Sequence, residues 1–115
     1  MLRRGQLYRV RRPAGDARRE RVYLIVSRDD FLEVRYSTAV CVPVYTAGGF
    51  SEAELPLGPS EGLKHASFGR CDELISVPRS KLTDYVGALP ADREHELNRA
   101  LAIALDIHPE DIEDL

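Results

Sequence analysis

The chain has 115 residues, of which 43% are hydrophobic and 30% charged, a length and composition typical of one folded globular domain. We expect a single domain over residues 1–115. The longest unbroken apolar run, Val22–Val26, is far shorter than the roughly 20 residues that cross a bilayer. No signal-peptide pattern follows Met1, so a soluble, cytoplasmic protein is expected, with no membrane association.

Charge is distributed unevenly although the formal net charge is only −3. Residues 1–35 contain ten Arg against five acidic residues, whereas residues 84–115 contain nine acidic residues against two Arg. An Arg-rich segment makes a local positive field suited to phosphates, while the acidic overall balance argues against a general duplex binder. On charge alone, the segment can equally be a solvated charged face.

Residues that could ligate a metal are scattered along the chain. Cys41 and Cys71 lie in apolar stretches, and His65, His95 and His108 have no second ligand at metal-binding spacing. We therefore expect two reduced, buried thiols, no metal site and no cofactor. The chain also lacks the GxSxG, P-loop, HExxH and dinucleotide fingerprints, which excludes the commonest hydrolase, nucleotide-binding and zinc-enzyme classes.

Alternating and β-branched patterns predict a series of short strands. They fall at residues 5–12, 22–27, 38–44, within 53–65, at 66–77 and at 83–89. The continuously apolar run at 22–27 is expected to be a buried central strand. The strand at 38–44 is expected to end or bulge at Pro43, which cannot donate to a ladder.

The segments between these strands are polar or rich in turn residues. A polar loop is expected at 13–21, and a connecting segment at 29–37 with a helical turn begun by Asp29 or Asp30. The Gly-bearing stretch 45–50 is expected to be a flexible loop, the kind of segment on which binding groups tend to sit.

From Pro90 onward, apolar residues recur with the spacing of a helix. One face of the expected helix carries five residues: Leu97, Ala100, Leu101, Ala104 and Leu105. Pro109 lies beyond its end, and the acidic tail 108–115 is expected to fray. Short strands followed by one terminal helix predict a mainly β fold, a small curled sheet or barrel with a packed helix.

One local pair suggests chemistry. Arg70 and Asp72 are two residues apart in an expected strand, so both side chains would project from the same face. A guanidinium and a carboxylate placed in this way can hold a phosphate and accept a proton. The same pair is also a common form of structural salt bridge.

The order of four segments resembles the MazF/PemK family of toxin endoribonucleases. They read RRGQLYRV, RVYLIVSRDDF, VCVPVYTAGGF and ASFGRCDELISVPRSKL, and with the terminal helix they cover Arg3 to Ile107. The Arg70-Cys71-Asp72 triplet is closest to the PemK/Kid branch. The resemblance implies a small SH3-like barrel, similar to CcdB, with a C-terminal helix. It also implies a homodimer that binds single-stranded RNA and a cognate MazE/PemI-like antitoxin.

Family members cleave RNA without metal, leaving a 2′,3′-cyclic phosphate and a 5′-hydroxyl, so the resemblance also assigns residue roles. Arg21 would stabilise phosphate charge, Asp72 would act as the base and Arg70 would stabilise charge. The hydroxyl at the phosphate is expected from Thr46, with Tyr45 as one alternative and no hydroxyl at all as the other. A last set is expected to contact RNA: Tyr45, Thr46, Asp16, Arg18, Arg19 and Ser67.

Three positions depart from the family pattern. Val22 replaces the Pro that follows the catalytic Arg, and Tyr45 stands where the family has Thr. The loop before Arg21 is one residue shorter, with Asp16 near a family His position. These departures predict altered sequence preference or reduced activity. The alternative is a non-catalytic relative, either a CcdB-like topoisomerase poison or a degenerate protein that only binds RNA or its antitoxin.

Overall fold

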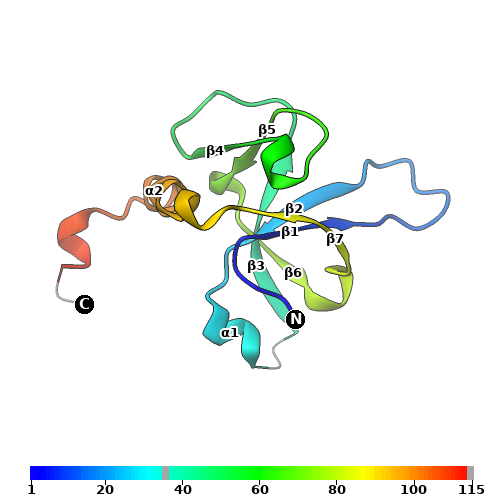
Figure 1. Cartoon of the computed structure of the whole chain (residues 1–115), viewed down its shortest axis with the longest axis horizontal. Coiled ribbons are helices and arrows are strands. Elements are labelled where there is room, and N and C mark those ends of the chain that lie inside the picture. The colour runs from blue at the N-terminus through cyan, green and yellow to red at the C-terminus, as the bar shows by residue number, and fades with distance from the viewer. Residues whose placement is uncertain (35–36, 114–115) are drawn as a thin grey trace.

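In the computed structural model, which describes residues 1–34 and 37–113, a curled antiparallel sheet carries a helix on one side (Figure 1). The described strands are β1 (Gln6–Val10), β2 (Arg21–Ile25), β3 (Thr38–Tyr45), β4 (Glu54–Leu57), β5 (Ser67–Arg70), β6 (Ile75–Pro78) and β7 (Asp84–Ala88). Their order is β4-β5-β3-β2-β1-β7, and β6 also pairs with β3. The expected fold class, mainly β with a C-terminal helix, is confirmed. Parts of the expected connecting segment and tail, at 35–36 and 114–115, lie outside the described residues.

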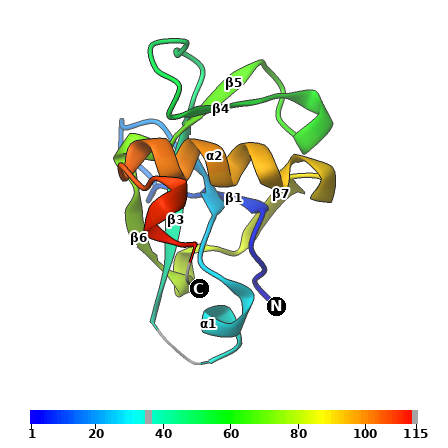
Figure 2. The same cartoon turned by 90° about the vertical axis from the view of Figure 1, so that its left-hand side faces the viewer.

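Both faces of the sheet bury apolar side chains, because neighbouring residues of a strand point to opposite faces. Leu7 and Leu24 belong to a first cluster, which helix α2 (Glu94–Ala104) covers with Leu97. The adjacent Tyr8 and Ile25 belong to a second cluster with Leu32 of α1 (Asp29–Glu33). Figure 2 shows α2 lying across the front of the sheet, with α1 below it at the lower end of the sheet.

The expected end of the strand at Pro43 is wrong, because β3 runs through it to Tyr45. The Val40 amide and carbonyl both bond toward the β2 side, so in an alternating strand Pro43 faces the opposite side. On that side β3 pairs with β6 up to Cys41 and with β5 from Val44 onward. The missing N–H of Pro43 therefore falls where the neighbouring strand changes, and no ladder bond is lost.

The expected strand at 66–77 is interrupted. It divides into β5 and β6 around the 3₁₀ turn η2 (Cys71–Glu73), so Asp72 is not on a strand. The rule that would place Arg70 and Asp72 on one strand face therefore does not apply. The turn occupies the place where β3 exchanges β6 for β5 as its partner.

The C-terminal helix begins after a 3₁₀ turn, η4 (Ala91–Arg93), and buries Leu97 and Ala100 as expected. Leu105 is 55% exposed and does not share that buried face, because the helix ends at Ala104. The tail holds one further turn, η5 (Pro109–Asp111), whose Asp111 carboxylate accepts the His108 N–H at 2.8 Å. No helix in the described parts of the chain is long and apolar enough to span a membrane.

The two cysteines are free and buried, as predicted. Burial raises the pKa of the Cys41 thiol to about 12, and burial together with the neighbouring Asp72 raises that of Cys71 to about 11. Both thiols therefore stay protonated at neutral pH and serve as small apolar core residues.

Strand β7 approaches the turn η1 (Pro59–Glu61) so closely that two glycines are required. A Cβ on Gly87 would lie 2.1 Å from the Glu61 carbonyl oxygen. A Cβ on Gly62, whose φ is +95°, would lie 2.4 Å from the Val86 carbonyl oxygen. The contact packs backbone against backbone, so neither side can yield by turning a side chain.

Gly87→Ala should lower the free energy of unfolding by about 1–3 kcal/mol, the usual cost of overpacking. The measurement is the urea midpoint of the purified protein. Gly58→Ala is the matched control, because its added Cβ meets Ala66 Cα at a comfortable 3.9 Å and its φ of −172° is open to any residue. Equal midpoints for the two variants would contradict the close approach.

Candidate functional site

Sheet register brings Arg21, Tyr45 and Arg70 together on three adjacent strands, β2, β3 and β5. The pairing of Val22 with Val44 brings the next residues, Arg21 and Tyr45, side by side. Tyr45 pairs with Phe68, which makes Arg70 its diagonal neighbour two residues along β5. All three side chains therefore project from the same face of the sheet.

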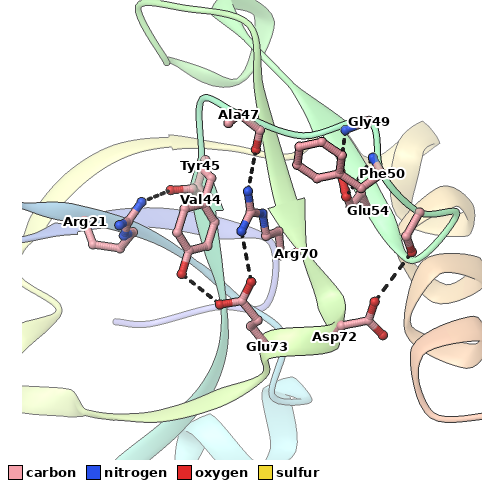
Figure 3. Close-up of polar contacts among 11 residues, drawn as sticks. Arg21, Val44, Tyr45, Ala47, Gly49, Phe50, Glu54, Arg70, Asp72 and Glu73 are labelled. Carbon is pink, nitrogen blue, oxygen red and sulfur yellow. Dashed lines mark hydrogen bonds and ion pairs between the residues drawn. The ribbon is translucent and has the colours of Figure 1, made fainter.

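The Tyr45 ring lies between the two guanidinium groups. The Cζ atom of Arg21 is 3.9 Å from the ring centroid and that of Arg70 is 4.0 Å from it. Figure 3 shows the guanidiniums on opposite sides of the ring. Each distance is well inside the range of cation–π attraction, which offsets part of the repulsion between the two cations. We call these three residues the Arg–Tyr–Arg stack.

Glu73 bridges Tyr45 and Arg70 of the stack. One carboxylate oxygen accepts the Tyr45 hydroxyl at 2.9 Å, and the other pairs with Arg70 Nη1 at 3.3 Å (Figure 3). Burial and the bond to Glu73 raise the pKa of the Tyr45 phenol, an effect that the two arginines only partly offset. Tyr45 is therefore a neutral hydrogen-bond donor at neutral pH.

The arginines also donate to the backbone, which fixes their planes. Arg21 Nη1 donates to the Val44 carbonyl at 3.0 Å, and Arg70 Nη2 donates to the Ala47 carbonyl at 2.9 Å. Arg70 Nε is buried and has no hydrogen-bond partner among the described residues. A guanidinium held in this way has little freedom left to lose when an anion binds, and it keeps unused donors.

Asp72 lies beside this cluster and outside its hydrogen bonds. Its side chain is exposed, and one oxygen accepts the Ser51 hydroxyl at 3.5 Å, turned away from the stack (Figure 3). The residue that pairs with Arg70 is Glu73, three positions along, because a 3₁₀ turn repeats every three residues. Sequence reasoning missed Glu73, and only the recognition of a turn after Arg70 could have identified it.

An open pocket of about 550 Å³ adjoins the stack. Arg21 and Tyr45 form part of its wall, and Glu20 is the acidic residue among those that line it. The remaining lining includes several basic side chains: Arg9, Arg11, Arg19, Lys64 and His65. Such a pocket attracts phosphate groups. In the described part of the chain, no three His, Cys, Asp or Glu residues gather as a metal site.

A family model for PemK-like, MazF-like toxins of type II toxin-antitoxin systems matches residues 3–105. The chain belongs to this toxin family. Among solved structures, it is similar to an endoribonuclease from a mycobacterial species in complex with its cognate antitoxin. The two share 26% identity with a TM-score of 0.79, over 94% of this chain and 98% of that one.

Two further structures support the assignment of the fold. Toxin MazF-mt6 of Mycobacterium tuberculosis is 26% identical with a TM-score of 0.73, over 78% of this chain and 90% of that one. A MazE-MazF structure from Deinococcus radiodurans gives a TM-score of 0.70 at 20% identity, over 93% of this chain and 97% of that one. At that identity the likeness concerns the fold alone.

Apart from Arg70 and Asp72, which do not line the pocket, the residues assigned by resemblance to the MazF/PemK family divide into two groups. Arg19, Thr46 and Ser67 line the pocket beside Arg21 and Tyr45. The Ser67 hydroxyl is buried and donates to the His65 carbonyl at 2.9 Å, so it does not face a ligand freely.

Asp16 and Arg18 form the second group, because they are not among the residues that line the pocket. They pair with each other at 2.8 Å in the loop before β2. The hydrogen bonds from Arg18 lower the pKa of Asp16 to about 2, so its carboxylate remains charged. The two residues therefore form a local ion pair beside the pocket's strands.

Proposed function

We propose that this toxin is a metal-independent endoribonuclease that acts on single-stranded RNA in the cytoplasm and leaves 2′,3′-cyclic phosphate and 5′-hydroxyl ends. The observation that carries the proposal is the convergence of Arg21 and Arg70 on Tyr45. RNA cleavage of this kind places growing negative charge on one phosphate. Two fixed guanidiniums are suited to stabilise that charge without a metal.

The reaction also needs a base for the ribose 2′-hydroxyl. Both oxygens of Glu73 are engaged, one by Tyr45 and one by Arg70. Asp72 is exposed and accepts only a long 3.5 Å hydrogen bond among the described contacts. Asp72 is therefore the better candidate for the base, with Arg21 and Arg70 stabilising charge and Thr46 or Tyr45 positioning the phosphate.

The test of this function is to incubate the purified protein with a long RNA in EDTA and to map the product ends. The proposal expects cleavage at a short recurrent sequence, with cyclic phosphate and 5′-hydroxyl ends. Intact RNA, or cleavage that requires added metal, would contradict it. The topoisomerase-poison alternative relies on an exposed end of α2, where Leu105 and Ile107 are 55% and 40% exposed. Inhibition of a topoisomerase without RNA cleavage would favour that alternative.

Variants of the two neighbouring carboxylates distinguish the base, Asp72, from Glu73, which bridges Tyr45 and Arg70. Asp72→Asn should lower the cleavage rate about 100-fold or more and leave RNA affinity unchanged or slightly higher, because it removes a negative charge near phosphate. Glu73→Gln is the matched control, one residue away, and should cost less than about 10-fold because the amide can still accept from Tyr45. Single-turnover rates and binding anisotropy check both variants. A wild-type rate for Asp72→Asn would exclude Asp72 as the base.

We further propose a homodimer and an antitoxin whose acidic segment covers the basic pocket. The positive lining of that pocket favours an acidic partner, and a relative at 26% identity was solved with its cognate antitoxin. Light scattering should give twice the chain mass for the toxin alone. It should give a heavier particle with the antitoxin, in which Arg21 is protected from arginine-modifying reagents. A monomer at micromolar concentration would contradict the homodimer. An Arg21 that stays reactive in the complex would contradict the covering of the pocket by the antitoxin.

A further inference from the structure

Phe50 is the most exposed aromatic residue in the described part of the chain, with 76% of its surface accessible. It lies in the loop that joins β3 to β4, next to the Arg–Tyr–Arg stack (Figure 3). A single exposed apolar side chain is ordinary on a protein surface. The fixed backbone of this residue and the neighbouring Arg70 distinguish the Phe50 ring from such a side chain.

The loop is fixed where it leads into Phe50. The Glu54 carboxylate accepts the Gly49 N–H at 2.7 Å and the Phe50 N–H at 3.2 Å. Gly48 lies so close to the Phe68 ring that a Cβ there would be 2.3 Å from it. The backbone that carries Phe50 is therefore clamped to strands β4 and β5, and its ring is presented at a set position.

The ring also extends the stack. Arg70 Cζ is 4.0 Å from the Tyr45 centroid and 5.8 Å from the Phe50 centroid. Cation and ring therefore alternate along a row that runs from Arg21 through Tyr45 and Arg70 to Phe50. The row ends at Phe50, on an exposed ring beside a guanidinium that is suited to hold a phosphate.

We propose that Phe50 is a stacking platform for the nucleobase next to the phosphate held by Arg70. This rests on the proposed RNA cleavage and adds a residue that contributes to affinity and to the choice of cleavage site. Exposed aromatic rings beside arginines are a common way to hold single-stranded bases. A protein partner is the alternative occupant: Pro56 and Phe68 lie beside the ring, but Ser51, Glu52 and Glu54 interrupt the contiguous apolar patch that docking requires.

The chain contains no Trp, so Phe50→Trp places a single Trp at the platform, and its fluorescence can be excited apart from that of the five Tyr. The probe is a 2′-O-methyl oligoribonucleotide, which binds but lacks the attacking hydroxyl. Fluorescence should be quenched on binding, and an oligonucleotide with an abasic unit at the cleavage site should quench much less. Ile112→Trp, at a 52% exposed position directly after η5, is the matched control and should not respond. Binding without quenching at position 50 would overturn the proposal.

Affinity variants provide the second arm. Phe50→Ala should weaken binding of the 2′-O-methyl oligonucleotide by roughly 5- to 150-fold, the usual contribution of one stacked base, and Phe50→Tyr should restore it. Wild-type affinity in Phe50→Ala would overturn the platform and leave the cleavage proposal standing. Failure of the unmodified protein to bind any RNA would overturn both. Loss of antitoxin binding alone in Phe50→Ala would reassign the ring to a protein contact.

Discussion

The packing of two guanidiniums against one phenol ring is the interaction on which the rest of the site depends. Arg21 and Arg70 approach the same ring within 4.0 Å, and two cations so close repel each other unless the surroundings compensate. The ring face, two backbone carbonyls and Glu73 supply that compensation. Two arginines and one glutamate leave one net positive charge, which a single phosphodiester can neutralise.

The fold brings these residues together through a change of partner along β3. That strand leaves β6 at Cys41 and joins β5 at Val44, and the chain between β5 and β6 forms the turn η2. Pro43 is tolerated at the change because it has no donor to satisfy there. The same turn carries both Asp72 and Glu73, so a break in the sheet supplies the two carboxylates beside the arginines.

Much of the fold could be predicted because its strands have clear alternation and its helix a clear apolar face. The central position of β2 followed from an unbroken apolar run, and the buried thiols from their apolar neighbours. The predicted strand end at Pro43 and the predicted placement of Asp72 on a strand were wrong for one reason. Both depend on which strand lies alongside β3, a long-range feature that local spacing does not contain.

Some residues of the candidate site were named from the sequence, mainly through family resemblance. Arg21, Tyr45 and Arg70 were named, yet their stacking depends on register across three strands and could not be read from spacing. Glu73 was missed because a strand period of two points to Asp72, whereas the 3₁₀ turn points to the third residue. Asp16 and Arg18 were assigned by position in a loop whose length differs, and they pair with each other.

Arginine side-chain NMR can show whether the Arg–Tyr–Arg stack is the phosphate site. The Nε–H signals of Arg21 and Arg70 would be followed while a non-cleavable 2′-O-methyl oligoribonucleotide is added. Both signals should shift together and saturate at the affinity measured by anisotropy. Saturated binding that leaves both signals unmoved, while those of Arg9 and Arg19 shift, would place the phosphate elsewhere and contradict this assignment.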